Sequence, residues 1–126
     1  MNIFAIIGAG LLSFGVGALW YTVLFGKRWM KELGITEQQI KESDAGTVPM
    51  LMSLGIEIVV SFLVFYTISK LQLSVFTAGL LISGITVFSA LKNYLFEQKS
   101  LTLIMINEGY KTVCIMIMAS FFYFFA

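Results

Sequence analysis

The sequence predicts an all-α membrane protein, built as an antiparallel bundle of four membrane-spanning helices. The first observation is composition: of 126 residues, 59% are hydrophobic and 12% charged, against about 45–50% and about 25% in soluble domains. The second is a mean hydropathy of +0.93. The third is that the apolar residues gather in four stretches, each near the roughly 20 residues that a helix needs to cross a bilayer. We therefore expect one integral membrane domain over residues 1–126.

Four spans are expected, at residues 3–25, 49–68, 73–96 and 101–125. The short polar links at 69–72 and 97–100 force an antiparallel return between the later spans. The segment 26–47 holds eight of the fifteen charged side chains and forms a loop at the membrane surface or in water. Within it, Gly34 ends a turn, and Thr36-Glu37-Gln38-Gln39 is typical of a capping box that opens a short amphipathic or polar helix to about Ser43.

Lysine and arginine in the short loops predict the orientation. One side of the membrane receives Lys27, Arg28, Lys31, Lys41 and Lys99, whereas the other receives Lys70 and the amino terminus. The lysine-rich side is expected to be cytoplasmic in a multi-pass protein of the cell membrane, with both termini outside. The lipid bilayer is the expected partner, and a net charge of +1 argues against nucleic acid.

Several kinds of chemistry are excluded. The chain has one cysteine and no histidine, so an internal disulfide and a histidine-based metal or catalytic site are impossible. The glycines of the first span do not follow a strand, so they are not a dinucleotide fingerprint, and Cys114 is expected to act as a small apolar residue. We expect no enzyme activity, no cofactor and no metal site.

The first span carries Ala9, Ser13 and Gly17 at intervals of four residues. Small residues at this spacing let helix backbones approach closely. This face is expected to pack against other helices, and it is a candidate contact between copies in a homo-oligomer. Directly after the span, a basic group with one tryptophan is expected to contact anionic lipid headgroups: Lys27, Arg28, Trp29 and Lys31.

Charged and amide side chains inside the spans form a second candidate site. Glu57 lies eight residues past Pro49, roughly 12 Å into its span, and Lys111 lies ten residues past Leu101, roughly 15 Å into the fourth. Both spans enter from the lysine-rich side, so six side chains could meet in the cytoplasmic half of the bundle: Glu57, Lys92, Asn93, Asn107, Glu108 and Lys111. Lys92 is more simply a flanking residue whose amine reaches the interface.

Intramembrane charges need partners, because one at a helix centre costs about 2.5–3.5 kcal/mol. Three pairings are open: Glu108 with Lys111 on one helix, Glu57 with Lys111 between helices, or Lys111 directed towards the headgroups. The charges then form a structural ion-pair lock, or a site for a ligand, ion or proton. Alternatively, the fourth span begins near Tyr110 and leaves Glu108 at the interface.

Two sets of residues carry a resemblance to a known family. The first is Gly17-Ala18-Leu19-Trp20-Tyr21, followed by Leu24-Phe25-Gly26-Lys27 and Trp29-Met30; the second is Phe96-Glu97, followed by Ile106-Asn107, Gly109-Tyr110 and Val113. Over nearly its whole length the chain resembles a group of small bacterial membrane proteins catalogued as domain of unknown function 1761. The resemblance implies four helices in one integral membrane domain and implies no activity.

Three functional hypotheses follow. The leading one is a non-catalytic structural or accessory membrane protein, possibly homo-oligomeric, whose charges stabilise the bundle. The second is a transporter or channel for a small solute or ion, with Glu57 as the binding or proton-carrying group; four helices are few for a complete pathway, so it requires oligomers. The third is an anionic-lipid-binding protein that uses Lys27, Arg28 and Lys31 beside Trp29.

Overall fold

The computed structural model describes residues 2–36, 38, 39 and 47–126. Over these residues the chain is helical and contains no strand. The elements are α1 (Ile3–Leu19), the π-helical η1 (Trp20–Leu24), α2 (Gly26–Leu33), α4 (Thr47–Lys70), α5 (Val75–Phe96) and α6 (Leu101–Phe125). Four segments are long and apolar enough to cross a membrane: Ile3–Leu24, Val48–Lys70, Val75–Phe96 and Leu101–Phe125. The prediction of an all-α chain with four candidate spans is confirmed.

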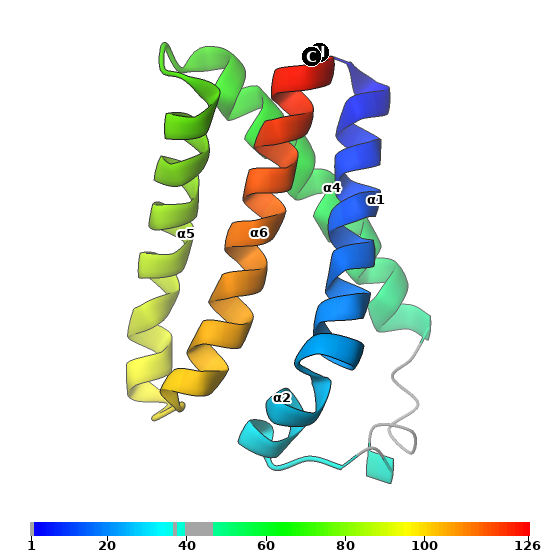
Figure 1. The fold of residues 1–126 in the computed structure, drawn as a ribbon, viewed down its shortest axis with the longest axis vertical. Helices are drawn as coiled ribbons and strands as arrows, with labels where there is room; N and C mark the ends of the chain where they lie inside the picture. The colour runs from blue at the N-terminus through cyan, green and yellow to red at the C-terminus, as the bar shows by residue number, and fades with distance from the viewer. Residues whose placement is uncertain (1, 37, 40–46) are drawn as a thin grey trace.

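The helix α6 is the central element, because it contacts α1, α4 and α5, whereas α4 and α5 touch each other little. Figure 1 shows the chain running along α1, returning along α4, and repeating this with α5 and α6. Both termini lie at one end, where the Asn2 side-chain amide donates to the Phe125 carbonyl at 3.0 Å. At the other end the Ser100 hydroxyl donates to Glu32 at 2.6 Å. That bond ties the α5–α6 turn to α2.

Side-chain caps decide where the helices begin. Ser74 and Ser100 have extended backbone conformations, and their hydroxyls accept hydrogen bonds from the Thr77 and Leu103 amides. This capping satisfies amide groups that have no partner inside the helix. The third span therefore starts at Val75 rather than at residue 73. The second starts at Thr47 rather than 49, which places Pro49 in the first turn, where its missing N–H is not needed.

The end of the first span differs from the prediction. Helix α1 widens into the π-turn η1, which the Phe25 amide closes by donating to the Trp20 carbonyl at 2.9 Å. Gly26 is required here, since a Cβ on it would lie 2.7 Å from the Tyr21 carbonyl oxygen. The chain then forms α2, a helix that the sequence analysis missed; only its end at Gly34, where φ is 73°, was predicted.

The predicted capping box is present in the residues described. The Thr36 amide donates to the Gln39 side chain at 2.8 Å, and the Gln39 amide donates to the Thr36 hydroxyl at 3.2 Å. These are the two reciprocal bonds of the motif. The predicted extension of this helix to Ser43 lies outside the described residues.

The small face of α1 packs within the chain. Ala9 and Ser13 are fully buried, and a Cβ on Gly10 would lie 2.9 Å from the Cα of Ile58, so α1 and α4 approach closely. The buried Ser61 hydroxyl donates to the Ile6 carbonyl at 2.8 Å across this contact. The expected helix packing is therefore observed. The chain's own helices cover Ala9 and Ser13, whereas Gly17 is partly buried, and contact of this face with a second copy stays a prediction.

Candidate functional site

The charges of α6 form a local network. Glu108 is only 4% exposed, and its carboxylate lies 2.9 Å from the Lys111 ammonium one helical turn away. The Tyr94 hydroxyl of α5 donates to the same carboxylate at 2.8 Å. Of the three pairings left open by the sequence, the structure shows the one within α6. Helix α6 also begins at Leu101, so the span is not shifted to Tyr110.

Aromatic residues of η1 hold α1 against α6. The Trp20 indole donates to the Ile106 carbonyl at 2.9 Å, and the Tyr21 hydroxyl donates to the Asn107 side-chain oxygen at 2.9 Å. Asn107 is therefore an inter-helix contact, as its position inside the span suggested. The wide π-turn supplies this geometry, because it directs two consecutive aromatic side chains towards the same neighbouring helix.

Glu57 occupies a different environment, in the middle of α4. The Tyr110 hydroxyl lies 3.2 Å from its carboxylate and 2.9 Å from the Ser13 carbonyl oxygen. A Cβ on Gly17 would fall 2.5 Å from that hydroxyl, so the glycine makes room for the tyrosine. Across residues 2–36, 38, 39 and 47–126, the ion pair is between Glu108 and Lys111, and Glu57 has no cationic partner. The pairing of Glu57 with Lys111 is not formed.

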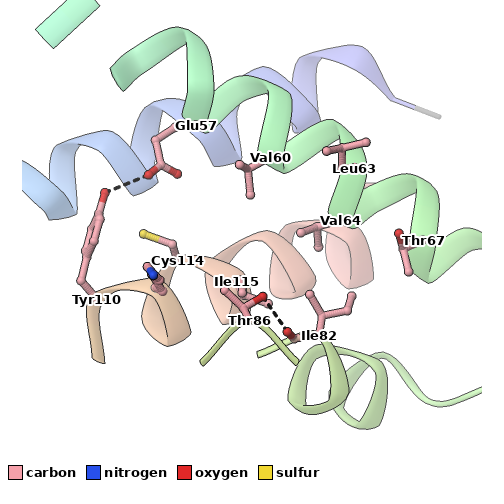
Figure 2. Close-up of a pocket in the computed structure, with 11 residues that line it drawn as sticks. Glu57, Val60, Leu63, Val64, Thr67, Ile82, Thr86, Tyr110, Cys114 and Ile115 are labelled. Atoms are coloured by element: carbon pink, nitrogen blue, oxygen red, sulfur yellow. Dashed lines mark hydrogen bonds between the residues drawn. The ribbon is translucent and has the colours of Figure 1, made fainter. Parts of the chain in front are cut away.

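Two cavities meet at the Glu57–Tyr110 pair. One, of about 410 Å³, lies between α4, α5 and α6 and also contacts Lys111 and Cys114. Figure 2 shows Glu57 and Tyr110 pointing towards each other at one end of it, with Val60, Leu63 and Val64 farther along α4. The other, of about 420 Å³, lies between α1, α2 and α4 and is called the aromatic cavity here. The residues that define the aromatic cavity are Phe14, Tyr21, Trp29, Ser53, Glu57 and Tyr110.

Not every predicted residue joins this site. Asn93 and Lys92 are exposed, and the described part of the chain offers the Asn93 side chain no hydrogen bond. The reason is helix geometry: neighbouring residues point about 100° apart, and Tyr94 takes the direction towards α6. The six-residue cluster expected from depth alone is therefore two separate groups, one around Glu108 and one around Glu57.

The predicted headgroup-contact residues on α2 also fall into two groups. Lys27, Arg28 and Lys31 are exposed on α2. Trp29 is half-buried, and its ring centroid lies 5.2 Å from that of Tyr21 in an edge-on arrangement. Trp29 also lines the aromatic cavity.

Tyr110 is a site residue that was not predicted from the sequence. Its hydroxyl connects α1, α4 and α6, but a tyrosine in an apolar span carries no local signal that separates such a role from packing. The available clue was that Tyr110 lies three residues after Asn107, on the same face of the helix. Metal binding finds no support in the described residues, which contain no group of three or more cysteine, histidine or acidic side chains.

Fold and site together define a class: small chains with four apolar helices able to cross a membrane and, on one of these helices, a carboxylate beside two cavities. The chain belongs to the family described as Protein of unknown function (DUF1761), whose model matches residues 4–123. The resemblance found in the aromatic and glycine motifs is thereby confirmed. Searches of curated proteins and of solved structures gave no match.

Proposed function

We propose that the chain crosses the cell membrane four times as an antiparallel bundle, with the α2 end in the cytoplasm and both termini outside. The lysine-rich loops support this orientation, and the termini share one end of the molecule (Figure 1). Large apolar side chains such as Phe4, Val23 and Phe88 are 72–83% exposed in the isolated chain. A hydrocarbon environment would cover them.

Within this membrane protein, we propose that Glu57 binds a small solute or ion and serves in its transport, without catalysis. One observation carries the proposal: Glu57 adjoins two cavities, and its hydrogen-bond partner is a tyrosine rather than a cation. Glu57 lies ten residues past Thr47 in a 24-residue helix, about 15 Å from its start. A carboxylate at this depth is costly unless a ligand, proton or counter-charge accompanies it.

The test is ion flux in proteoliposomes. Glu57→Gln keeps the size of the side chain and removes its charge, so proton- or cation-driven flux should fall to the level of empty vesicles. The matched control is Glu97→Gln, an exposed glutamate at the α5–α6 turn, which should leave flux unchanged. Flux that is the same in wild type and Glu57→Gln would remove this function.

A structural or accessory role is the second candidate, and the network of Glu108, Lys111 and Tyr94 favours it. A closed ion pair with a third hydrogen bond stabilises a helix contact without any ligand. This role accounts for the charges of α6, but it leaves Glu57 and its two cavities without a purpose. We therefore assign the Glu108–Lys111 pair to stability and Glu57 to binding.

Lipid binding is a third candidate, supported by a cavity of about 330 Å³ that Arg28 shares with Trp20, Phe25 and Met105. A guanidinium beside an apolar groove fits an anionic phospholipid, since anionic headgroups attract basic residues at roughly 1 kcal/mol each. Replacing Lys27, Arg28 and Lys31 by glutamine should weaken binding to phosphatidylglycerol vesicles. Unchanged binding would remove this candidate.

We also propose that the transporting form is a homo-oligomer, because four helices are few for a complete path across a bilayer. Contact between copies through the small face of α1 would then involve Gly17, since Ala9 and Ser13 are already buried. Chemical crosslinking in native membranes checks this point, and exclusively monomeric bands would contradict it.

A further inference from the structure

We propose that the aromatic cavity binds a hydrophobic organic monocation, with the Glu57 carboxylate as its counter-charge and the rings of Tyr21, Trp29 and Tyr110 around its apolar body. The inference rests on the proposed function, because it names the ligand class of the same carboxylate. It concerns the cavity between α1, α2 and α4 rather than the one that contains Lys111.

The sign of the ligand's charge follows from the lining. Among the described residues that line the aromatic cavity, Glu57 carries the only charge. Arg28 and Lys31, basic residues of α2 close to Trp29 in sequence, are exposed and do not line the aromatic cavity. The cavity on the other side of Glu57 includes Lys111, whose ammonium would repel a cation there. A positively charged ligand is therefore favoured on the α1–α2 side alone.

The rings add a second attraction. Tyr21 packs edge-on against both Trp29 and Tyr110, with centroid distances of 5.2 and 5.5 Å. All three rings line the aromatic cavity, and a cation within about 6 Å of an aromatic face is attracted by the ring's electrons. The hydroxyls of Tyr21 and Tyr110 are held by Asn107 and Ser13. These bonds preorganise the rings for a ligand.

Tyr110 allows Glu57 to engage a ligand at little cost. A phenol has one proton to donate, and the Tyr110 hydroxyl lies within hydrogen-bonding distance of two acceptors, the Ser13 carbonyl oxygen and Glu57. When it donates to Ser13, the hydroxyl stays satisfied and the carboxylate is available. Binding a cation at Glu57 therefore leaves no buried donor unpaired.

The remaining lining selects an organic cation over a metal ion. Phe14, Ala18 and Met50 contribute apolar surface, whereas a hard cation such as calcium takes about 6–8 oxygen ligands. The volume of about 420 Å³ lies within the roughly 300–1,000 Å³ of sites for drug-sized molecules. Size, charge and lining thus agree on one ligand class.

The probe is tetraphenylphosphonium, with purified protein in detergent and binding measured by equilibrium dialysis. The wild type should bind it saturably, and Glu57→Gln should weaken binding at least tenfold, which corresponds to about 1.4 kcal/mol. Glu97→Gln is the matched control and should bind as the wild type does. The uncharged triphenylphosphine oxide should bind at least tenfold more weakly to the wild type than the cation does.

A second variant guards against misfolding of Glu57→Gln. Ser53 is exposed and lies four residues before Glu57 on α4, so Ser53→Lys places an ammonium beside an intact carboxylate. This variant should also lose at least tenfold in affinity while it keeps its helical circular dichroism. Trp29→Phe should remove the part of the tryptophan quenching that saturates with probe binding, because Trp29 lines the aromatic cavity and Trp20 does not.

The outcomes separate the two proposals. Absence of saturable binding, or equal affinity of wild type, Glu57→Gln and Ser53→Lys, overturns the organic-cation site. If Glu57-dependent flux of protons or sodium persists without binding of the probe, the ligand class is wrong while the proposed function stands. If neither flux nor probe binding depends on Glu57, both proposals fail.

Discussion

Replacing Lys111 by methionine tests whether the network on α6 stabilises the protein. Methionine keeps the length and apolar contacts of the stem but removes the ammonium. Among the described residues, the Glu108 carboxylate, 4% exposed, then keeps Tyr94 as its one side-chain partner. Removing one partner of a buried ion pair exposes the remaining charge to an environment that solvates it poorly. We expect a clear loss of thermal stability.

The magnitude follows from the geometry. Two unit charges 2.9 Å apart attract by about 5–6 kcal/mol at an effective dielectric constant of about 20. Desolvation offsets much of this, and breaking a fully buried pair costs about 3–5 kcal/mol. The Lys111 side chain is 42% exposed and contacts the cavity between α4, α5 and α6, so the pair is not fully buried. We expect Lys111→Met to lower the free energy of unfolding by about 1–3 kcal/mol, below the fully buried value.

The assay is thermal unfolding in detergent, read by circular dichroism. The double variant Lys111→Met, Glu108→Gln should recover at least about 1 kcal/mol, because residues in direct contact couple by about 0.5–3 kcal/mol. Combining Lys111→Met with Glu57→Gln should be additive, since these two side chains form no ion pair. Lys99→Met, at an exposed turn position, is the control and should cost little. Coupling with Glu57 but not with Glu108 would refute the reasoning.

Two further substitutions probe the packing of α1 and η1. Gly26→Ala should lower stability by about 1–3 kcal/mol, because the new Cβ would lie 2.7 Å from the Tyr21 backbone oxygen, which cannot move aside as a side chain could. Ser61→Ala should cost about 0.6 kcal/mol and at most about 1.7 kcal/mol, the average and the maximum measured for hydrogen bonds between membrane helices, because it removes the buried bond to the Ile6 carbonyl. Thermal unfolding in detergent measures both.

Matched controls are available for each. A Cβ on Gly15 meets nothing within 4 Å, so Gly15→Ala should leave stability unchanged or raise it by up to about 1 kcal/mol through helix propensity. Among the described residues, the exposed Ser120 hydroxyl bonds to the Met116 carbonyl of its own helix and to no other helix, so Ser120→Ala should be nearly neutral. Equal effects at Gly26 and Gly15, or at Ser61 and Ser120, would show that the described helix contacts do not govern stability.

Local chemistry made the spans and several boundaries predictable. Helices α5 and α6 coincide with the third and fourth apolar stretches of the sequence. The serine that caps each of them accepts a hydrogen bond from an amide three residues later. The Thr36–Gln39 box could be read for the same reason, since both of its bonds join residues three apart. Helix α2 was not predicted because its eight residues mix charged and apolar side chains, so no continuous apolar stretch indicates it.

The candidate site was predictable only in part. Glu57, Glu108 and Lys111 stand out in sequence because charges are rare at such depth. Their partners depend on how each helix is rotated and how far it is displaced along its neighbours. The rotation of each helix about its axis decides that Lys111 pairs with Glu108. It also decides that Tyr94, and not its neighbour Asn93, contacts Glu108, and that the Trp29 ring packs against Tyr21.

By itself, the sequence determined that this protein is a helical chain with four segments able to cross a bilayer, since hydropathy and capping act over a few adjacent residues. Only the tertiary structure decided that the small face of α1 is covered by α4 and α6, and that Tyr110 reaches both Ser13 and Glu57. Such contacts join residues tens of positions apart. Their energy depends on the relative placement of whole helices, which no local pattern of residues encodes.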